Sequence, residues 1–410
     1  MLELWRLIAV GLFCRYWNDC ISGQANALAA PLLPANQGLV TEKSQHRVLF
    51  AGGGTAGHLM PAVNIALALS RKDKTIKALF VGKRGGMEAA IVSRFGFQTK
   101  EIEIAGLKRN PLGIIRFVWN WNKGLKQAAE IIEEFQPDVV VGTGGYVSAP
   151  VVRAARKKNI PIFMQEQNSL PGLATRTLSK MAENVFIAYD SAANFLPREK
   201  CRLVGNPVRP DLLDSQRSTS ISEFGLEPSL KTLLIVGGSS GAHGINSAVL
   251  SIVNSGQIPS GWQLLWQIGQ KEFDSVSAAI DREKFKGKYQ PFIHNMPGAY
   301  ATADLIISRA GAMALAEIAA WGLPSILIPY PFATGDHQSL NAREFVETGA
   351  AEVIPESKIG IRLTPALTEL LASAEKRSQM AIASKKLARP EAASLIAETI
   401  LEKINEVQTN

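Results

Sequence analysis

Cysteine and histidine are scarce in this chain of 410 residues, which contains three cysteines and five histidines. Cys14, Cys20 and Cys201 have neither the spacing of a metal site nor the number needed for a disulfide framework. These absences exclude a disulfide-rich secreted scaffold and favour a reducing compartment. No D-x-D pair follows a predicted strand, so the sequence requires neither a metal nor another cofactor.

Long apolar runs are also missing. Leu7–Cys14 is too short to span a bilayer, and no later segment qualifies as a transmembrane helix. With Arg6 before it and Ala25–Ala27 after it, this run weakly imitates a secretory signal. Because the rest of the chain is typical of a cytosolic nucleotide-using protein, we expect residues 1–46 to be a disordered or artefactual extension. The true start then lies downstream, for example at Val40.

The composition that remains is that of a soluble globular protein, with 46% apolar and 20% charged residues. The length suffices for two domains with separate cores. A formal net charge of +8 favours acidic partners such as nucleotides, pyrophosphates, nucleic acid or an anionic membrane surface.

Apolar, β-branched runs alternate with helical patterns from residue 47 onward, which predicts an α/β fold with a parallel sheet covered on both faces. The predicted strands in this part are 48–51, 78–81, 139–141, 160–164, 184–188 and 202–204. The pattern restarts after a breaker-rich stretch, with strands predicted at 233–236, 262–267, 305–307 and 325–328.

These patterns predict two facing Rossmann-like domains. The first covers residues 47–205 and the second covers 231–390, with a linker at 206–230 between them. In residues 391–410, Ile396, Ile400 and Ile404 form one i, i+4 row, which predicts a helix with one buried face that packs across both domains.

A glycine-rich loop, Gly52–Gly57, follows the first predicted strand and has the G-x-G-x-x-G spacing of dinucleotide-binding proteins. Such a site also needs an acidic residue after the next strand. That strand ends in Gly82–Gly86, which contains Lys83 and Arg84 but no carboxylate. An NADP-dependent oxidoreductase therefore stays open as an alternative. His58 directly follows the loop, where it is placed to act as a donor or a base.

Three further loops follow predicted strands. Gly237–Ala242 precedes a helix and resembles a phosphate cradle, and Gly142–Pro150 is a second glycine cluster. The third loop, Gln165–Asn168, is entirely polar. Farther along, Glu317 lies among apolar residues of a predicted helix, where it either accepts two ribose hydroxyls or pairs with the helix dipole. The polar segment Asp336–Asn341 is suited to reading sugar hydroxyls.

Taken together, GGGTAGHLMP, GTGGYVSAP, QEQN, GNPVR, VGGSSGAHGIN, SRAGAMALAEIAAWGLPSILIP and DHQSLNA closely resemble the motifs of the MurG family. The resemblance covers residues 47–400. It implies the two-domain GT-B fold, with UDP-N-acetylglucosamine (UDP-GlcNAc) held mostly by the second domain. It also implies that the first domain holds lipid I, a muramyl-pentapeptide on undecaprenyl pyrophosphate, and that the product is lipid II, formed with inversion to a β-1,4 linkage.

The resemblance also implies site residues. By this resemblance, Ser239 contacts the donor phosphates, the backbone of Ile293 binds the uracil and Glu317 binds the ribose. Gln338 and Asn341 bind the hydroxyls of the donor sugar. The full implied substrate-binding set is Thr55, Ala56, Gly57, Asn168, Arg209, Ser239, Ile293, Ala312, Met313, Ala314, Leu315, Ala316, Glu317, Gln338 and Asn341. The acceptor-side loop is Gly144, Gly145 and Tyr146.

Two positions depart from the family pattern. Ala56 stands where a glycine is usual, and Gln165 stands where the motif more often has a histidine. A glutamine does not titrate, so the general base of an inverting transfer is either His58 or Glu166.

The segment Gly106–Lys126 mixes aromatic and aliphatic residues with five cations, a pattern that suits an anionic membrane interface. Burial of the same helix against the sheet is the competing interpretation. The resemblance implies a peripheral enzyme on the cytoplasmic face of the bacterial inner membrane, with cell-wall synthesis proteins as partners and no nucleic acid. A transferase acting on diacylglycerol and a non-catalytic UDP-sugar-binding protein stay open as alternatives.

Overall fold

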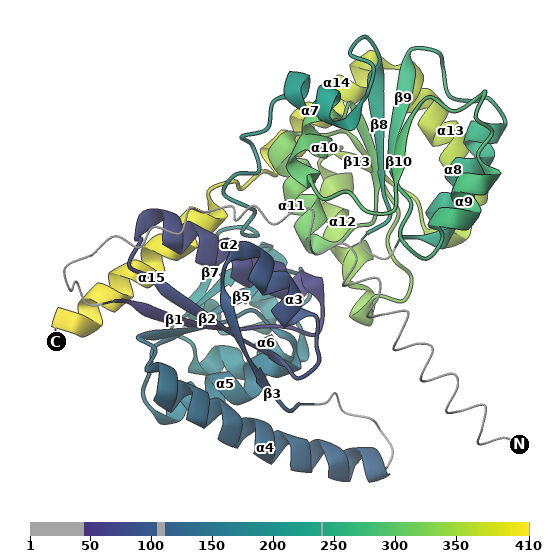
Figure 1. Cartoon of the computed structure of the whole chain (residues 1–410). Coiled ribbons are helices and arrows are strands. Elements are labelled where there is room, and N and C mark those ends of the chain that lie inside the picture. Colours follow the sequence, from purple (N-terminus) through teal and green to yellow (C-terminus); the bar gives the residue numbers. More distant parts are fainter. Residues whose placement is uncertain (1–44, 105–110, 239–240, 410) are drawn as a thin grey trace, which may run out of the picture.

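The computed structural model describes residues 45–104, 111–238 and 241–409, and gives only the backbone of residues 111–118 and 408–409. Most of the extension expected at residues 1–46 therefore lies outside the described residues. Two α/β lobes follow one another along the chain, and the C-terminal helix lies against the first of them (Figure 1).

The first lobe is built on a seven-stranded sheet with the order β3-β2-β1-β4-β5-β6-β7, in which every pair is parallel. Its strands are β1 (Arg47–Ala51), β2 (Lys77–Lys83), β3 (Gln98–Ile102), β4 (Val139–Gly142), β5 (Ile162–Glu166), β6 (Asn184–Ile187) and β7 (Cys201–Leu203). Its helices are α2 (Ala56–Lys72), α3 (Glu88–Val92), α4 (Pro111–Phe135), α5 (Gly145–Lys157) and α6 (Leu173–Leu178).

The second lobe repeats the plan with a six-stranded parallel sheet in the order β10-β9-β8-β11-β12-β13. Its strands are β8 (Lys231–Val236), β9 (Trp262–Gln267), β10 (Gly287–Gln290), β11 (Leu305–Ser308), β12 (Ser325–Leu327) and β13 (Ala351–Val353). Its helices are α7 (Arg217–Phe224), α8 (His243–Asn254), α9 (Phe273–Ala279), α10 (Met296–Thr302), α11 (Ala312–Trp321), α12 (His337–Glu347), α13 (Ile359–Ala372) and α14 (Ala374–Lys386).

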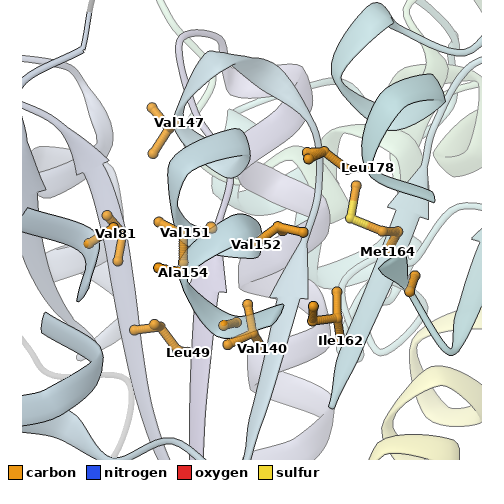
Figure 2. Packing of buried hydrophobic residues seen from close by; sticks show 14 of the residues in the cluster. Leu49, Val81, Val140, Val147, Val151, Val152, Ala154, Ile162, Met164 and Leu178 are labelled. Carbon is orange, nitrogen blue, oxygen red and sulfur yellow. The ribbon is translucent and has the colours of Figure 1, made fainter. Parts of the chain in front are cut away.

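Both faces of the first sheet are covered by crossover helices, so its central strands are buried along almost their whole length. On one face α5 packs with Val151 and Ala154 close to the strand residues Leu49 and Val140 (Figure 2). On the other face, Phe50 and Phe80 stack with ring centroids 5.0 Å apart. The α/β fold predicted from the sequence is thus confirmed.

The structure differs from expectation in the stretch 206–230, which the sequence analysis interprets as a linker. This stretch contains α7, whose Ile221 and Phe224 are buried in the core of the second lobe with Val208 and Leu212. Polar residues hide this helix in the sequence because its buried face is only a few residues wide. The passage from the first lobe to the second is therefore shorter than the expected linker.

The C-terminal helix α15 (Ala392–Thr409) packs on α2 of the first lobe. Ile396, Ile400 and Ile404 are fully buried in the cluster that contains Phe50. Lys72 and Glu398 join the two helices by an ion pair of 2.7 Å. The chain thus returns to the first lobe after it has completed the second.

Candidate active site

Two glycine loops meet at the carboxyl ends of the neighbouring strands β1 and β4. The loop after β4 turns into α5 at Gly145, which has a φ of 77°. A side chain there would place its Cβ 2.2 Å from the carbonyl oxygen of Gly53, so the close approach of the two loops requires glycine. The Thr143 hydroxyl then donates a hydrogen bond of 2.6 Å to the His58 carbonyl oxygen. The loops lie where parallel α/β sheets bind ligands.

His58 lies in the first turn of α2 and is partly exposed. Its Nδ1 lies 3.0 Å from Oε1 of Gln167, a residue of the polar loop after β5. No described residue forms a hydrogen bond with its Nε2. The ring is therefore held on one side by an amide and keeps its second nitrogen available.

Glu166, the other candidate base, is buried and already engaged. Its Oε1 accepts hydrogen bonds from the backbone amide and side chain of Asn168 at 3.0 and 3.2 Å, and its Oε2 accepts one from the amide of Gly172 at 3.2 Å. These contacts shape the loop that follows β5. A carboxylate with this role is less available for proton transfer than a half-exposed imidazole.

The sequence analysis missed Glu88, a carboxylate that lies beside the first glycine loop. Glu88 is only 1% exposed, and its Oε1 accepts a hydrogen bond of 2.8 Å from the amide of Gly54. No described residue donates to its Oε2. Its carboxylate lies where a Cβ on Gly53 or Gly86 would collide with it. The carboxylate of Glu88, which belongs to α3, therefore occupies the space beside the first glycine loop.

In the second lobe, α11 lies against α2 of the first lobe, begins with Ala312 and carries the implied ribose-binding residues. We call the region between α11 and the loops of the first lobe the cleft. Met313, Ala314, Ala316 and Glu317 are partly exposed, whereas Ala312 and Leu315 are buried and present only their backbone. The Tyr300 hydroxyl donates a hydrogen bond of 2.8 Å to Oε2 of Glu317. Burial raises the pKa of Glu317 to about 7, although the bond from Tyr300 and the charge of Arg209 lower it.

The implied uracil-binding position, Ile293, is fully buried, and its amide already donates a hydrogen bond of 2.9 Å to Oε1 of Gln267. The Gln267 side chain donates in turn to the Gly238 carbonyl at 2.8 Å. The side chain of Gln267 therefore ties the Ile293 backbone to the phosphate-type loop after β8. Ser239, which belongs to that loop, lies outside the described residues.

Arg209 lies near the passage between the lobes and is paired with Asp211. Two nitrogens of its guanidinium donate to this carboxylate at 3.0 and 2.7 Å, and the guanidinium also lies over the Phe95 ring. Desolvation raises the pKa of Asp211, but the bonds from Arg209 outweigh it, so this pKa is lowered overall. The positive charge of Arg209 also lowers the pKa of Glu317, a residue of α11.

The two lobes touch through Asn341 of α12. Its Oδ1 accepts from the amide and hydroxyl of Ser169 at 2.9 and 3.1 Å, and its Nδ2 donates to Oδ1 of Asn168 at 3.0 Å. Gln338, one turn earlier, accepts from the amides of Ala310 and Tyr330 at 3.2 and 2.9 Å. The structure thus brings Asn168 and Asn341, which the resemblance assigns to the donor, into direct contact.

His337 begins α12, on the second-lobe side of the cleft. Burial lowers its pKa, the Glu166 carboxylate raises it and the His58 ring lowers it again. His337 therefore lies close enough to Glu166 and His58 for both to act on its pKa. The sequence offered no separate signal for His337, because it lies inside the polar segment Asp336–Asn341.

The remaining predicted residues lie at the cleft rim. Thr55 is exposed before α2, Gly57 is exposed in its first turn, and Tyr146 is 57% exposed in the first turn of α5. Ala56 is the first helical residue and does not have a positive φ. Its methyl group therefore imposes no strain, which answers the question raised by its departure from glycine.

The segment Gly106–Lys126 is only partly described. Residues 106–110 lie outside the described residues, and the side chains of 111–118 do too. Trp119 is 63% exposed with Lys123 over its ring, whereas Trp121 packs against the core under Arg153. In the view of Figure 1, α4 borders the first lobe on the side away from the second.

Two searches of the described residues bear on the expected partners. None of their helices combines the length and apolarity needed to cross a membrane. Nor do the described histidine, cysteine, aspartate and glutamate side chains form a group of three or more that could hold a metal ion.

Two parallel α/β lobes in succession are the architecture of the GT-B glycosyltransferases. Comparison with known families agrees with this class. Residues 48–187 match the glycosyltransferase family 28 N-terminal domain, and residues 232–396 match the family 28 C-terminal domain.

Individual relatives narrow the assignment. The chain is 40% identical over 367 residues to a protein of Desulforamulus reducens, covering 87% of this chain and 98% of the relative. It is 39% identical over 360 residues to one of Bacillus licheniformis, covering 87% and 98%. Both are named "UDP-N-acetylglucosamine--N-acetylmuramyl-(pentapeptide) pyrophosphoryl-undecaprenol N-acetylglucosamine transferase".

A solved structure gives the same answer. The crystal structure of MurG from Acinetobacter baumannii is 26% identical and superposes with a TM-score of 0.70, covering 87% of this chain and 99% of that one. The chain belongs to the MurG family of glycosyltransferases.

Proposed function

We propose that this protein transfers N-acetylglucosamine from UDP-GlcNAc to lipid I and so forms lipid II. The observation that carries the proposal is 40% identity along 98% of the length of a relative named for this reaction. The cleft between the two lobes, lined by polar residues of both, is consistent with a transfer between two bound substrates.

The proposed step is a single displacement. The acceptor hydroxyl oxygen bonds to the anomeric carbon, the bond from that carbon to the UDP oxygen breaks, and UDP departs with the bonding electron pair. The configuration at the anomeric carbon inverts, giving the β-1,4 linkage. His58 takes the hydroxyl proton on Nε2, the ring nitrogen without a described partner. Glu166 is the weaker candidate because both of its oxygens already accept hydrogen bonds.

The second lobe is proposed to hold the donor. Glu317 accepts ribose hydroxyls through Oε1, since Oε2 already accepts the bond from Tyr300. Ile293 reads uracil through its carbonyl, because its amide is committed to Gln267. Gln338 and Asn341 read the sugar hydroxyls. The other proposed contacts are Thr55, Ala56, Gly57, Asn168, Arg209, Ser239, and the residues Ala312–Ala316 of α11.

The negative charge of departing UDP needs stabilisation. Helix α8 begins at His243 and α11 at Ala312, and we propose that the N-termini of these two helices face the phosphates of UDP. These backbone dipoles support transfer without a required metal, which is our proposal for this chain.

The first lobe is proposed to hold lipid I at the loop Gly144, Gly145 and Tyr146 and to rest on the membrane. Exposed Trp119 with Lys123 over its ring supports a contact between Gly106–Lys126 and an anionic surface. The enzyme would then work as a peripheral protein on the cytoplasmic face of the inner membrane, beside other cell-wall synthesis proteins.

One observation speaks against the NADP-dependent alternative. A dinucleotide would place its pyrophosphate on the amides of the loop Gly52–Gly57. In this chain the Gly54 amide instead donates to the buried carboxylate of Glu88, which would repel a phosphate. Titration with NADPH should therefore show no saturable change in its fluorescence.

The decisive experiment measures UDP release from UDP-GlcNAc in the presence of a lipid I analogue, of diacylglycerol or of neither. We expect release with the lipid I analogue alone. Release with diacylglycerol alone would overturn the proposed acceptor. With the analogue, His58→Ala should lower kcat by roughly 10²- to 10⁴-fold, and near-normal turnover by this variant would exclude His58 as the base.

A further inference from the structure

Three buried amide side chains form a hydrogen-bonded chain that ends on His58. Asn206 donates through Nδ2 to the carbonyl oxygens of Gln167 and Ala312 at 3.0 and 3.3 Å. Gln165 donates to Oδ1 of Asn206 at 3.1 Å, and Gln167 donates to Oε1 of Gln165 at 2.5 Å. Oε1 of Gln167 then lies 3.0 Å from Nδ1 of His58.

Backbone carbonyls fix the direction of this chain. An amide group has nearly the same shape when its nitrogen and oxygen are exchanged, so its orientation follows from its partners. Asn206 meets two carbonyl oxygens, which only accept, and Gln167 also donates to the Thr143 carbonyl at 2.9 Å. Both must therefore present their NH₂ groups to these carbonyls. Gln167 in turn must present its oxygen to His58.

We infer that Gln167, Gln165 and Asn206 are positioning residues that hold a proton of His58 on Nδ1. The Gln167 oxygen can only accept, so Nδ1 must carry the hydrogen. In the neutral ring, Nε2 then carries the free electron pair. The consequence for catalysis rests on the proposed function, because a base must offer an unprotonated nitrogen to the acceptor hydroxyl.

Burial keeps this arrangement in place. Gln165, Gln167 and Asn206 are 0%, 2% and 4% exposed, so water competes little for their hydrogen bonds. Gln165 occupies the position where the family motif more often has a histidine. An amide both donates and accepts without titrating, and so transmits the same orientation at every working pH.

The chain also begins in the other lobe. Ala312, whose carbonyl oxygen accepts from Asn206, is the first residue of α11, the helix proposed to hold the donor. The tautomer of His58 is thereby tied to the placement of the second lobe against the first. A ring preorganised in this way needs no rearrangement when the acceptor arrives.

The test is a nitrogen-15 NMR measurement of imidazole tautomers in the full chain. The sequence has five histidines, so the signals of His58 are identified as those lost in His58→Gln. We expect the unmodified protein to show His58 protonated on Nδ1. Gln167→Met removes the accepting oxygen and should shift His58 toward the tautomer protonated on Nε2. With lipid I analogue, kcat should then fall roughly tenfold at an unchanged KM for UDP-GlcNAc.

Gln263→Met is the matched control. Gln263 is also 2% exposed and makes amide hydrogen bonds, to the backbone of Glu227, but lies far along the chain in the second lobe. Its loss should affect stability similarly and leave the His58 tautomer unchanged.

The outcomes separate the inference from the proposed function. His58 protonated on Nε2 in the unmodified protein would overturn the inference, as would an unchanged tautomer in Gln167→Met. The wild-type spectrum decides this even where the variant fails to fold. A shifted tautomer with unchanged kcat would uphold the positioning role and remove His58 from the role of base.

Discussion

At the scale of single residues, Glu317 combines a partly buried carboxylate with one hydrogen-bond donor, the Tyr300 hydroxyl. Desolvation raises its pKa to about 7, and the hydrogen bond from Tyr300 limits that rise. The unfolded chain, by contrast, releases this proton near the ordinary value of 4.5. Between these values the folded protein holds a proton that the unfolded chain has lost, so stability declines as pH rises.

Glu317→Gln should remove this decline. Between about pH 5 and pH 8 the free energy of unfolding of the unmodified protein should fall by on the order of 2 kcal/mol relative to that of the variant. The measurement is chemical denaturation of the ligand-free protein at several pH values. Tyr300→Phe removes the bond that lowers the pKa and should extend the decline to higher pH. Parallel pH curves for Glu317→Gln and the unmodified protein would contradict the prediction.

Residue-level prediction from the sequence depended on residue types that follow a strand end. The glycine loops, His58 and the polar segment Gln165–Asn168 were identified in this way, and the structure brings them together. Glu88 was missed because it lies on α3, which follows β2 and is distant in sequence from the first glycine loop. Only the fold brings it to Gly54. The orientation of Gln167 was also beyond the sequence, because it depends on carbonyl groups of three separate segments.

At the scale of elements, every central strand was predicted, and so was the edge strand β7, whereas the other three edge strands were missed. The missed strands β3, β10 and β13 are edge strands of the two sheets. Their residues are partly exposed, and β3 reads QTKEI with a single buried residue. An edge strand does not need the continuous apolar run by which a buried strand is recognised. The composition of these edge strands therefore resembles that of a loop.

The C-terminal helix α15 was predicted to pack across both domains, and its buried isoleucine row packs in the core of the first lobe. The isoleucine row of α15 predicted one buried face, and these residues are fully buried against α2 and the first sheet. The i, i+4 spacing cannot say which surface the face covers. In the structure, α15 covers the first lobe and closes its core from the far end of the chain.

Ile400→Ala should therefore destabilise the first lobe by about 2–4 kcal/mol, because it leaves a cavity in a fully packed cluster. Chemical denaturation gives the free energy of unfolding. Leu395→Ala is the matched control on the same helix, since Leu395 is 46% exposed, and its effect should stay within about 0.5 kcal/mol. Equal losses in the two variants would mean that α15 has no preferred buried face.

At the scale of the whole molecule, the chain passes between the lobes twice, and the two passages lie against each other. Gly205 on the outward passage has a φ of 93°, and a Cβ there would lie 2.4 Å from Cβ of Arg389 on the return. A glycine is needed at this crossing for both reasons. Two adjacent passages allow the lobes to rotate relative to each other. The contacts between the lobes, such as those of Asn341, then determine how closely they approach.

Asn341 provides the most direct of these contacts, since both ends of its amide bond to the first lobe at Ser169 and Asn168. Asn341→Leu removes all three hydrogen bonds. Without ligand, the lobes of this variant should separate more often, raising the radius of gyration in solution scattering by on the order of 1 Å. Asn254→Leu is the matched control because the side chain of Asn254 forms its hydrogen bonds within the second lobe, to the carbonyl of Ala279 and from the amide of Asp281.

The same contact predicts how the donor acts. If Asn341 binds the donor sugar as proposed, the sugar hydroxyls of UDP-GlcNAc must replace the hydrogen bonds that Asn341 makes to Ser169 and Asn168. UDP alone lacks those hydroxyls, so it should leave the radius of gyration of the unmodified protein unchanged while UDP-GlcNAc alters it. In Asn341→Leu, the affinity for UDP-GlcNAc should drop roughly tenfold and that for UDP should not. Equal losses for both ligands would place Asn341 away from the sugar and leave it as a contact between lobes alone.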